Sequence, residues 1–432
     1  MKLAIHGGKP VRSKLFPAYK IIGDEEKEAV CRVMDSGILS RFLGRWHDDF
    51  YGGPEVQSLE KEWAGFFDKK HAIALNSCTS GLYATVGAIG IEPGEEVIVT
   101  PYTMCATATA PLIYNAIPIF ADIEEDYFCL NPDAVEEKIT PRTRAILVVD
   151  IFGQSYDAEA INEIARKYGL IVIEDTAQAP GAFYKGKSAG TLGDIGVFSL
   201  NYHKHIHCGE GGVVVTDNDE FAERIRLIRN HAEAVSMDRG LENVANLIGF
   251  NFRMTEIEAA IARCQLKKLT GLVKERQKNC DYMAKRLGEI PAIIPPAVRD
   301  GCTHVYYIQP FKFNEEEAGV HRDRFIEAVK AELAPTERRE GEGVKVVCGY
   351  EKPLYLQPIF KNKTAYGSKG SPFVKPWYDG DVKYEKGLCP VTERMYEKEL
   401  FYHDLMRPGM SKGDMDDVIM AFGKVWDNRH ML

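Results

Sequence analysis

The chain has 432 residues, of which 45% are hydrophobic and 27% charged, so it can bury a large core and is not intrinsically disordered. Its net charge of −9 disfavours a protein that binds nucleic acid through the phosphate backbone, and no run of about 18 apolar residues predicts a membrane span. The ten cysteines form no CxxC pair and the N-terminus has no apolar leader. We therefore expect a soluble cytoplasmic protein without nucleic-acid or membrane partners.

From about residue 70 to 215, short apolar runs alternate with amphipathic stretches. This alternation is typical of an α/β fold whose mainly parallel sheet is covered on both faces. In such sheets, ligands bind at the carboxyl ends of the strands. The predicted strands are residues 71–75, 96–100, 117–121, 145–149, 171–174, 196–199 and 212–216, and the predicted helices between them are 80–90, 103–114 and 157–168.

The second half of the chain begins with two helical patterns, over residues 220–231 and 255–287. The longer one is expected to cross between domains, so we predict a large domain over 1–265, with an N-terminal arm, and a smaller C-terminal α/β domain over 266–432. Residues 335–390 are rich in Pro, Gly, Tyr and Lys and have poor periodicity. They predict a long irregular excursion, and such loops are usually functional or mobile.

The strongest chemical motif surrounds Lys204, which follows the predicted strand 196–199 and precedes a glycine-rich turn at 209–212. A Schiff-base lysine needs a neutral amine, which burial or nearby positive charge favours. His203 and His205 flank Lys204 and fit that need. Taken alone, a lysine in a loop is most often a solvated charge, so the interpretation depends on context.

Two upstream segments supply that context. Asp175 stands at the carboxyl end of a predicted strand, where a carboxylate could keep the pyridine nitrogen of pyridoxal phosphate (PLP) protonated. A helix N-cap is an equal alternative for it. Thr79 and Ser80 stand where a strand passes into a helix. Hydroxyls and free amides there can cradle a phosphate, although capping alone would also explain them.

In their order and spacing, these segments resemble the DegT/DnrJ/StrS sugar aminotransferases, a branch of the fold-type-I PLP enzymes. The resemblance covers roughly residues 15–290 well and the last third loosely. It implies a large domain with a mainly parallel sheet and a smaller C-terminal α/β domain. The positions that carry it are Asp175, Gln178, Ser199, Lys204 and the turn at 209–212.

The resemblance also implies roles for single residues. Lys204 becomes the catalytic lysine that binds PLP, and Asp175 pairs with the pyridinium nitrogen. Gln178 lies near the phenolic oxygen of the cofactor. The phosphate contacts implied are Thr79, Ser80 and Ser199.

One further motif, residues 249–254, matches a segment whose asparagine reaches the cofactor phosphate of the neighbouring subunit. Asn251 therefore implies a homodimer with shared active sites. Arg253 is a candidate anchor for the carboxylate of the amino-acid donor, because a guanidinium fork suits a carboxylate. An interface or capping role for Arg253 is equally open.

Relatives place an aromatic residue over the PLP ring, whereas Met104 stands at that position here. A thioether can pack on a ring face but offers less flat contact, so Tyr102 is the alternative. The alternation His203-x-His205-x-His207 could also gather a zinc ion. No Cys or carboxylate has matching metal spacing, so we expect no metal and predict that His203 and His205 tune Lys204 or contact substrate.

The sequence therefore predicts a PLP-dependent aminotransferase. We expect it to move an amino group from glutamate (or glutamine) to a keto sugar, nucleotide-linked, by a ping-pong mechanism in amino-sugar or polysaccharide biosynthesis. A sugar dehydratase on the same scaffold is one alternative, but there relatives replace the lysine with histidine, and Lys204 argues against it. A non-catalytic regulatory protein need not retain lysine, aspartate and phosphate cradle together.

Overall fold

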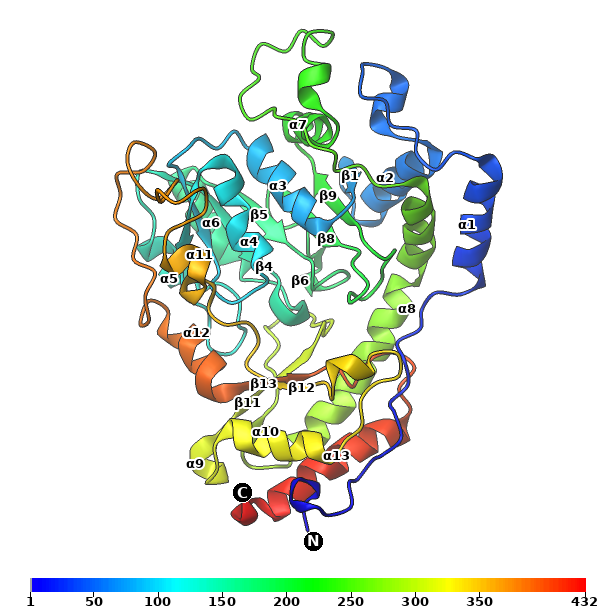
Figure 1. Ribbon diagram of the computed structural model, residues 1–432, viewed down its shortest axis with the longest axis vertical. Helices are drawn as coiled ribbons and strands as arrows, with labels where there is room; N and C mark the ends of the chain where they lie inside the picture. The colour runs from blue at the N-terminus through cyan, green and yellow to red at the C-terminus, as the bar shows by residue number, and fades with distance from the viewer. Residues whose placement is uncertain (1) are drawn as a thin grey trace.

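The computed structural model describes residues 2–432 and shows a large α/β unit above a smaller C-terminal one (Figure 1). The helix α8 (Glu256–Leu287) runs from the first into the second, so the boundary predicted at residue 265 falls inside one continuous helix. Both termini lie at the far end of the smaller unit (Figure 1). No helix within residues 2–432 is long and apolar enough to cross a membrane.

A seven-stranded sheet in the order β1-β9-β8-β5-β4-β2-β3 forms the centre of the large unit. The strands from β8 to β3 run parallel, whereas β9 is antiparallel to both its neighbours. The mainly parallel sheet is thus confirmed, and each predicted strand lies within two residues of an observed one. The strands are β1 (His71–Leu75), β2 (Glu96–Val99), β3 (Ile117–Phe120), β4 (Thr143–Val149), β5 (Ile171–Asp175), β8 (Ile195–Ser199) and β9 (Gly212–Thr216).

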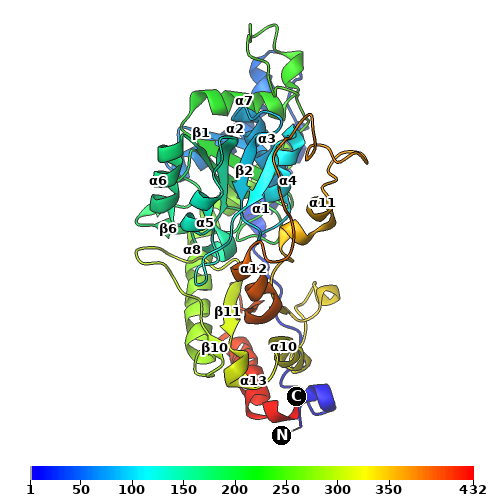
Figure 2. The ribbon, with the colours of Figure 1, turned by 90° about the vertical axis from the view of Figure 1, so that its left-hand side faces the viewer.

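Helices cover both faces of this sheet (Figures 1 and 2). They are α2 (Pro54–Phe66), α3 (Cys78–Ala88), α4 (Ala106–Thr109), α5 (Pro132–Glu137), α6 (Ala158–Tyr168) and α7 (Asp219–Arg229), whereas α1 (Asp24–Ser36) packs on α8. Alternate residues of β1 point to opposite faces: Ile73 packs in the core with α3 and α7, and Ala74 in the core with α2 and α8. Continuous apolar strands are the expected result.

One predicted helix, over residues 103–114, is wrong in extent. Only the single turn of α4 and a 3₁₀ turn at Pro111–Tyr114 form there. Pro111 lacks the backbone N–H that a continuing α-helix requires. The residues before α4 instead form the loop that follows β2, at the edge of the sheet where the site lies.

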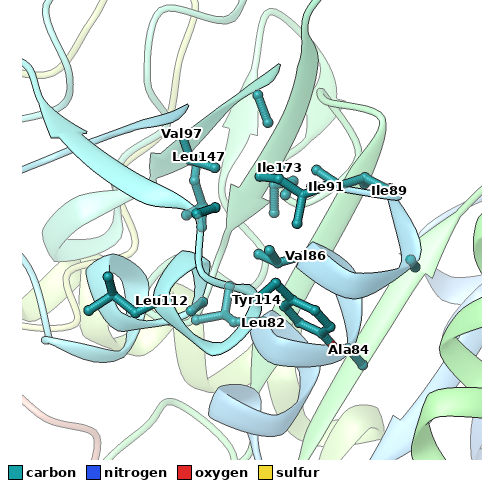
Figure 3. Close-up of a cluster of buried hydrophobic side chains, with 14 of the residues drawn as sticks. Leu82, Ala84, Val86, Ile89, Ile91, Val97, Leu112, Tyr114, Leu147 and Ile173 are labelled. Atoms are coloured by element: carbon teal, nitrogen blue, oxygen red, sulfur yellow. The ribbon is translucent and has the colours of Figure 1, made fainter. Parts of the chain in front are cut away.

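The core on one face of the sheet lies between α3 and the central strands (Figure 3). Glycines let α3 come close: a Cβ at Gly81 would lie 2.9 Å from Cγ1 of Val197 on β8, and one at Gly87 would lie 2.2 Å from the hydroxyl of Tyr114. The N-terminus of α3 is thereby held beside the end of β8. Side chains labelled in this core include Leu82, Val86, Val97, Leu147 and Ile173.

The smaller unit holds a four-stranded antiparallel sheet in the order β10-β11-β13-β12. Its strands are β10 (Ile293–Ile294), β11 (Gln309–Phe313), β12 (Val346–Cys348) and β13 (Leu400–His403), and its helices are α9 (Glu315–Ala318), α10 (Arg322–Ala331) and α13 (Lys412–Asp427). Leu3 and Phe16 of the N-terminal arm are buried in the same core as Phe311, Phe401 and Phe422. The arm therefore packs on the smaller unit before the chain enters α1.

The excursion at residues 335–390 is irregular, as predicted, and its later part, with α11, lies beside the large unit (Figure 2). Its regular pieces are β12 and α11 (Pro358–Lys361), and α12 (Pro390–Arg394) follows it. The Tyr384 hydroxyl donates to the Pro118 carbonyl at 2.6 Å, and the Tyr378 hydroxyl to Glu96 at 2.7 Å. The segment thus covers an edge strand that would otherwise be open to pairing.

Candidate functional site

Lys204 lies in the loop between β8 and β9, at the carboxyl end of the parallel strands. Its backbone N–H donates to the Asn201 carbonyl at 2.9 Å, which fixes the turn. Its Nζ lies 4.2 Å from the centre of the Tyr307 ring, a cation–π distance. Tyr307 follows α8 in the chain, so the smaller unit contributes one wall around this amine.

Asp175, the last residue of β5, faces the same space. Its side chain is 5% exposed; Oδ2 accepts a hydrogen bond from the Thr107 hydroxyl at 2.9 Å, and Oδ1 one from the Ala177 N–H at 3.1 Å. Burial raises the pKa of Asp175, whereas these two bonds and the charge of Lys204 act to lower it. A turn and no helix follows Asp175, so helix capping does not explain it.

The candidate phosphate cradle lies where β1 passes into α3. Ser77 caps the helix by accepting a bond from the Ser80 N–H at 3.0 Å, and the Ser80 hydroxyl donates to Asn76 at 2.7 Å. Within residues 2–432 the Thr79 hydroxyl has no hydrogen-bond partner. Among the hydroxyls of Ser77, Thr79 and Ser80, the one still available to a ligand is therefore that of Thr79.

Gly212 explains how Ser199 reaches this cradle. In the sheet register Gly212 of β9 lies between Leu75 of β1 and Ser199 of β8. A Cβ at Gly212 would lie 2.5 Å from the backbone nitrogen of Cys78, so only glycine lets the strand approach the start of α3. Ser199 is thereby held one strand away from the N-terminus of α3.

The side-chain amide of Gln178 is held by two hydrogen bonds, which fix which of its atoms accepts and which donates. Its Oε1 accepts from the Phe152 N–H at 2.8 Å, and its Nε2 donates to the Tyr350 hydroxyl at 3.1 Å. Because a backbone N–H can only donate, the orientation of the amide is set and one N–H of Nε2 stays free. Phe152 adopts a φ of 60°, a costly conformation for a residue with a side chain, which suits a position that orients a functional group.

The two flanking histidines differ in placement. Nδ1 of His203 lies 3.0 Å from Nη2 of Arg339; because arginine only donates, Nδ1 accepts and Nε2 carries the proton. Burial, helped by the charge of Arg339, lowers the pKa of His203 to about 4, so this ring is neutral.

His205 is 1% exposed and donates through Nε2 to the Val305 carbonyl at 2.8 Å. The substrate contact predicted for His205 therefore has no support in this geometry.

Asn251 and Arg253 lie at the rim of the cradle. The Asn251 carbonyl is 3.4 Å from Nδ2 of Asn76, and its Oδ1 accepts from Nε of Arg253 at 2.7 Å. Asn251 is exposed. Arg253 also lies 3.5 Å from Oδ1 of Asn230, on the large-unit side of the site.

Met104 and Tyr102, the two candidates to cover a cofactor ring, differ sharply in exposure. Met104 is 56% exposed in the loop before α4. Tyr102 is fully buried and packs edge-on against Phe152 and Tyr350. Met104 is therefore the one of the pair that a ligand can reach.

Several residues of the site were missed by the sequence analysis. Thr107 lies in a segment that gave only a helical pattern, and its bond to Asp175 spans 68 positions of the chain. Tyr307, Arg339 and Tyr350 lie in the part of the chain where the family resemblance is loose. No local signal marks them, because the fold alone brings them to Lys204 and Gln178.

This set of groups fits PLP. Asp175 is a buried carboxylate that has no ion pair within residues 2–432, and a protonated pyridine nitrogen would supply the missing cation. The start of α3, with Thr79 and the nearby Ser199, offers amides and hydroxyls for a phosphate. Lys204 supplies an amine on the same side of the sheet.

Comparisons with known proteins agree with this chemistry. Residues 21–373 match the DegT/DnrJ/EryC1/StrS aminotransferase family. The chain is similar to the spore coat polysaccharide biosynthesis protein SpsC of Bacillus subtilis strain 168, at 33% identity over 407 residues, 93% of this chain and 94% of SpsC. A Streptoalloteichus tenebrarius protein, whose name proposes L-glutamine:3-amino-2,3-dideoxy-scyllo-inosose aminotransferase activity, is 32% identical over 434 residues, 99% of this chain and 98% of its own.

A solved structure gives the same result. DesV of S. venezuelae, in complex with a ketimine intermediate, superposes with a TM-score of 0.78 at 27% identity, covering 96% of this chain and 99% of that one.

Proposed function

Because the chain belongs to the DegT/DnrJ/EryC1/StrS aminotransferase family, we propose that it moves an amino group from glutamate or glutamine to a nucleotide-linked keto sugar. The chain is a fold-type-I PLP-dependent aminotransferase, and the resemblance drawn from its sequence is confirmed. One observation carries the assignment of the site: the amine of Lys204 shares the strand ends with a buried Asp175 that has no ion-pair partner within residues 2–432. The polysaccharide role named for SpsC supports a sugar acceptor.

The chemistry divides between cofactor and protein. When bound, PLP supplies a conjugated ring that delocalises the negative charge left on a substrate carbon after a proton is removed. Lys204 takes that proton as a base and returns it as an acid, because its amine lies at the same strand ends as Asp175. The Tyr307 ring lies 4.2 Å from Nζ and holds the amine in place between the two steps.

The other side chains hold positions. Asp175 keeps a proton on the ring nitrogen, and Thr107 orients that carboxylate. Gln178 directs its free N–H at the phenolic oxygen of the cofactor, held by Phe152 and Tyr350. Thr79 and Ser199 would contact the phosphate, Ser80 would join them only by giving up its hydroxyl bond to Asn76, and Met104 would pack on the ring.

The enzyme is a homodimer in this proposal. Asn251 is exposed at the rim and contributes to the phosphate site of the partner subunit, so neither protomer alone completes its site. Transfer is ping-pong: the donor leaves as its oxo acid before the keto sugar enters. His203, which is neutral and carries its proton on Nε2, offers a donor to a substrate hydroxyl.

A screen of acceptors tests the proposal. The enzyme, loaded with pyridoxamine phosphate, is mixed with nucleotide-linked keto sugars, free keto cyclitols and 2-oxo acids, and the products are identified by mass spectrometry. Amination of a nucleotide-linked keto sugar, absent in Lys204→Ala, is the expected result. Amination of cyclitols or 2-oxo acids alone would overturn the acceptor, and loss of water from the sugar without amination would identify a dehydratase.

A further inference from the structure

Three arginines from distant parts of the chain gather on the smaller-unit side of Lys204: Arg276 in α8, Arg339 in the excursion and Arg407 after β13. Nη2 of Arg407 donates to Asp404 at 2.6 Å, and Nη1 of Arg339 reaches the same oxygen at 3.4 Å. Nη1 of Arg276 donates to the carbonyls of Tyr306 and Tyr307, at 2.9 and 3.2 Å. We call these three side chains the arginine cluster.

Positive charge exceeds negative charge in the arginine cluster. Asp404 is the carboxylate that Arg339 and Arg407 share, and Glu342, the second partner of Arg339, is also bound by Lys345. Arg276 is 1% exposed and pairs with no carboxylate within residues 2–432. A buried cation without a counter-charge is unfavourable, so the cluster is suited to receive an anion.

Unmade hydrogen bonds point the same way. Nε of Arg407 and both Nε and Nη2 of Arg276 are buried without a partner. The guanidinium groups of Arg276 and Arg407 lie 5.4 and 5.5 Å from the centre of the Tyr19 ring, but Arg276 is buried and can act on a ligand only through its charge. Arg407 is the more accessible of the two, with 11% of its side chain exposed, and its Nη1 forms no hydrogen bond within residues 2–432.

The arginine cluster lies next to the reacting amine. The ring of Tyr307 contacts the Lys204 amine, while the backbone carbonyl of Tyr307 accepts a hydrogen bond from Arg276. Arg339 reaches His203, the residue directly before Lys204 in the chain. A donor whose amino group comes to the position of the Lys204 amine would therefore have Arg276 and Arg339 on its smaller-unit side, with Arg407 joined to Arg339 through Asp404.

We infer that Arg407, oriented by Asp404 and supported by the charges of Arg276 and Arg339, binds a carboxylate of the amino-acid donor. This inference rests on the proposed function and deepens it. A guanidinium accepts a carboxylate in a two-bond fork, which a lysine cannot reproduce. Arg253, the anchor expected from the sequence, lies instead against Asn251 and Asn230 at the cradle rim and in this account binds no donor.

Maleate, a dicarboxylate with no amino group to react, probes the site directly. Its Kd for the PLP-loaded enzyme is measured by calorimetry for the wild type, Arg407→Gln, Arg407→Lys and Arg253→Gln. Arg324→Gln serves as the matched control, because Arg324 is exposed and pairs only with Glu327. We expect Arg407→Gln to weaken binding by about tenfold or more, Arg407→Lys by less, and the Arg253 and Arg324 variants to match the wild type.

Unchanged PLP absorbance and unchanged Tm show that each variant is folded and loaded; Arg407→Lys, which keeps the charge, serves if Arg407→Gln does not fold. Wild-type maleate affinity in the Arg407 variants, or its loss in Arg253→Gln, would overturn the inference. The proposed function can fail separately. If the Arg407 variants bind maleate more weakly but the wild type aminates no keto sugar, the carboxylate site is supported and the keto-sugar acceptor is rejected.

Discussion

The hydroxyl of Thr107 donates a 2.9 Å hydrogen bond to Oδ2 of Asp175, and both side chains are buried. A bond to a charged oxygen in a site shielded from water is stronger than the same bond at the surface. The second oxygen of Asp175 is held by the Ala177 N–H. Thr107 is therefore a positioning residue that sets the direction in which the carboxylate faces.

Thr107→Val removes this bond and keeps the shape of the side chain. Because hydrogen bonds to charged groups contribute about 1.5–3 kcal/mol, turnover should fall by about tenfold or more. Thr109→Val is the matched control, since the Thr109 hydroxyl on the same turn bonds only to the Ala106 carbonyl. Steady-state kcat and thermal unfolding are measured for both variants. Equal kcat values for the two variants would show that Thr107 does not position Asp175 for catalysis.

Asp175→Asn should retain bound PLP and lose most activity. An amide cannot stabilise a protonated ring nitrogen as a carboxylate does, and the expected loss in kcat is on the order of a hundredfold or more. PLP content is measured by absorbance alongside kcat. Near-normal turnover would mean that Asp175 only shapes the turn through its bond to Ala177.

Asp150 and Glu174, two buried carboxyl groups, give a pH-dependent prediction. Burial and then the charge of Glu174 raise the pKa of Asp150 well above its usual range. The folded state thus holds a proton that the unfolded state releases from about pH 4 upward, so this group makes stability fall as pH rises toward its folded pKa.

Asp150→Asn imitates the protonated form and should reduce that loss. The Tm of the variant should fall less than that of the wild type between about pH 5 and about pH 8. Asp48→Asn, at an exposed position, is the control and should follow the wild type. Parallel Tm profiles for Asp150→Asn and wild type would show that Asp150 is ionised throughout.

Subunit mixing tests whether active sites are shared. Lys204→Ala and Asn251→Asp are each inactive or weak alone, and they are mixed under conditions that allow subunits to exchange. If Asn251 serves the partner's phosphate site, each heterodimer has one site with both defects and one intact site, so activity partly returns. Persistent inactivity despite demonstrated exchange, or a fully active monomer, would overturn the shared site.

Much of the large unit could be predicted from sequence because strands that are buried on both faces of a sheet have continuous apolar runs. Residues 71–75 and 212–216 were predicted with the bounds that β1 and β9 have in the structure. The helix over 103–114 failed because its periodicity gave no sign that the segment before α4 is a loop and that Pro111 breaks the rest. Residues of the site that are adjacent in sequence, such as Asp175 and Gln178, came from a recognisable motif.

The other half of the site could not be predicted. Tyr350 reaches Gln178 across 172 positions, and Arg339 reaches His203 across 136. Such contacts depend on where the irregular excursion returns to the large unit, and neither periodicity nor composition encodes that path. The sequence also gave no reason to prefer Arg407 over Arg253, because charge balance around a guanidinium becomes visible only in the folded chain.

Reduction of the PLP-loaded enzyme with borohydride, followed by digestion and mass spectrometry of the peptides, tests the role of Lys204 most directly. We expect the cofactor on Lys204, and we expect Lys204→Ala to fold with the wild-type Tm, to trap no cofactor and to have no aminotransferase activity. Cofactor on another lysine, or wild-type turnover by Lys204→Ala, would contradict this role.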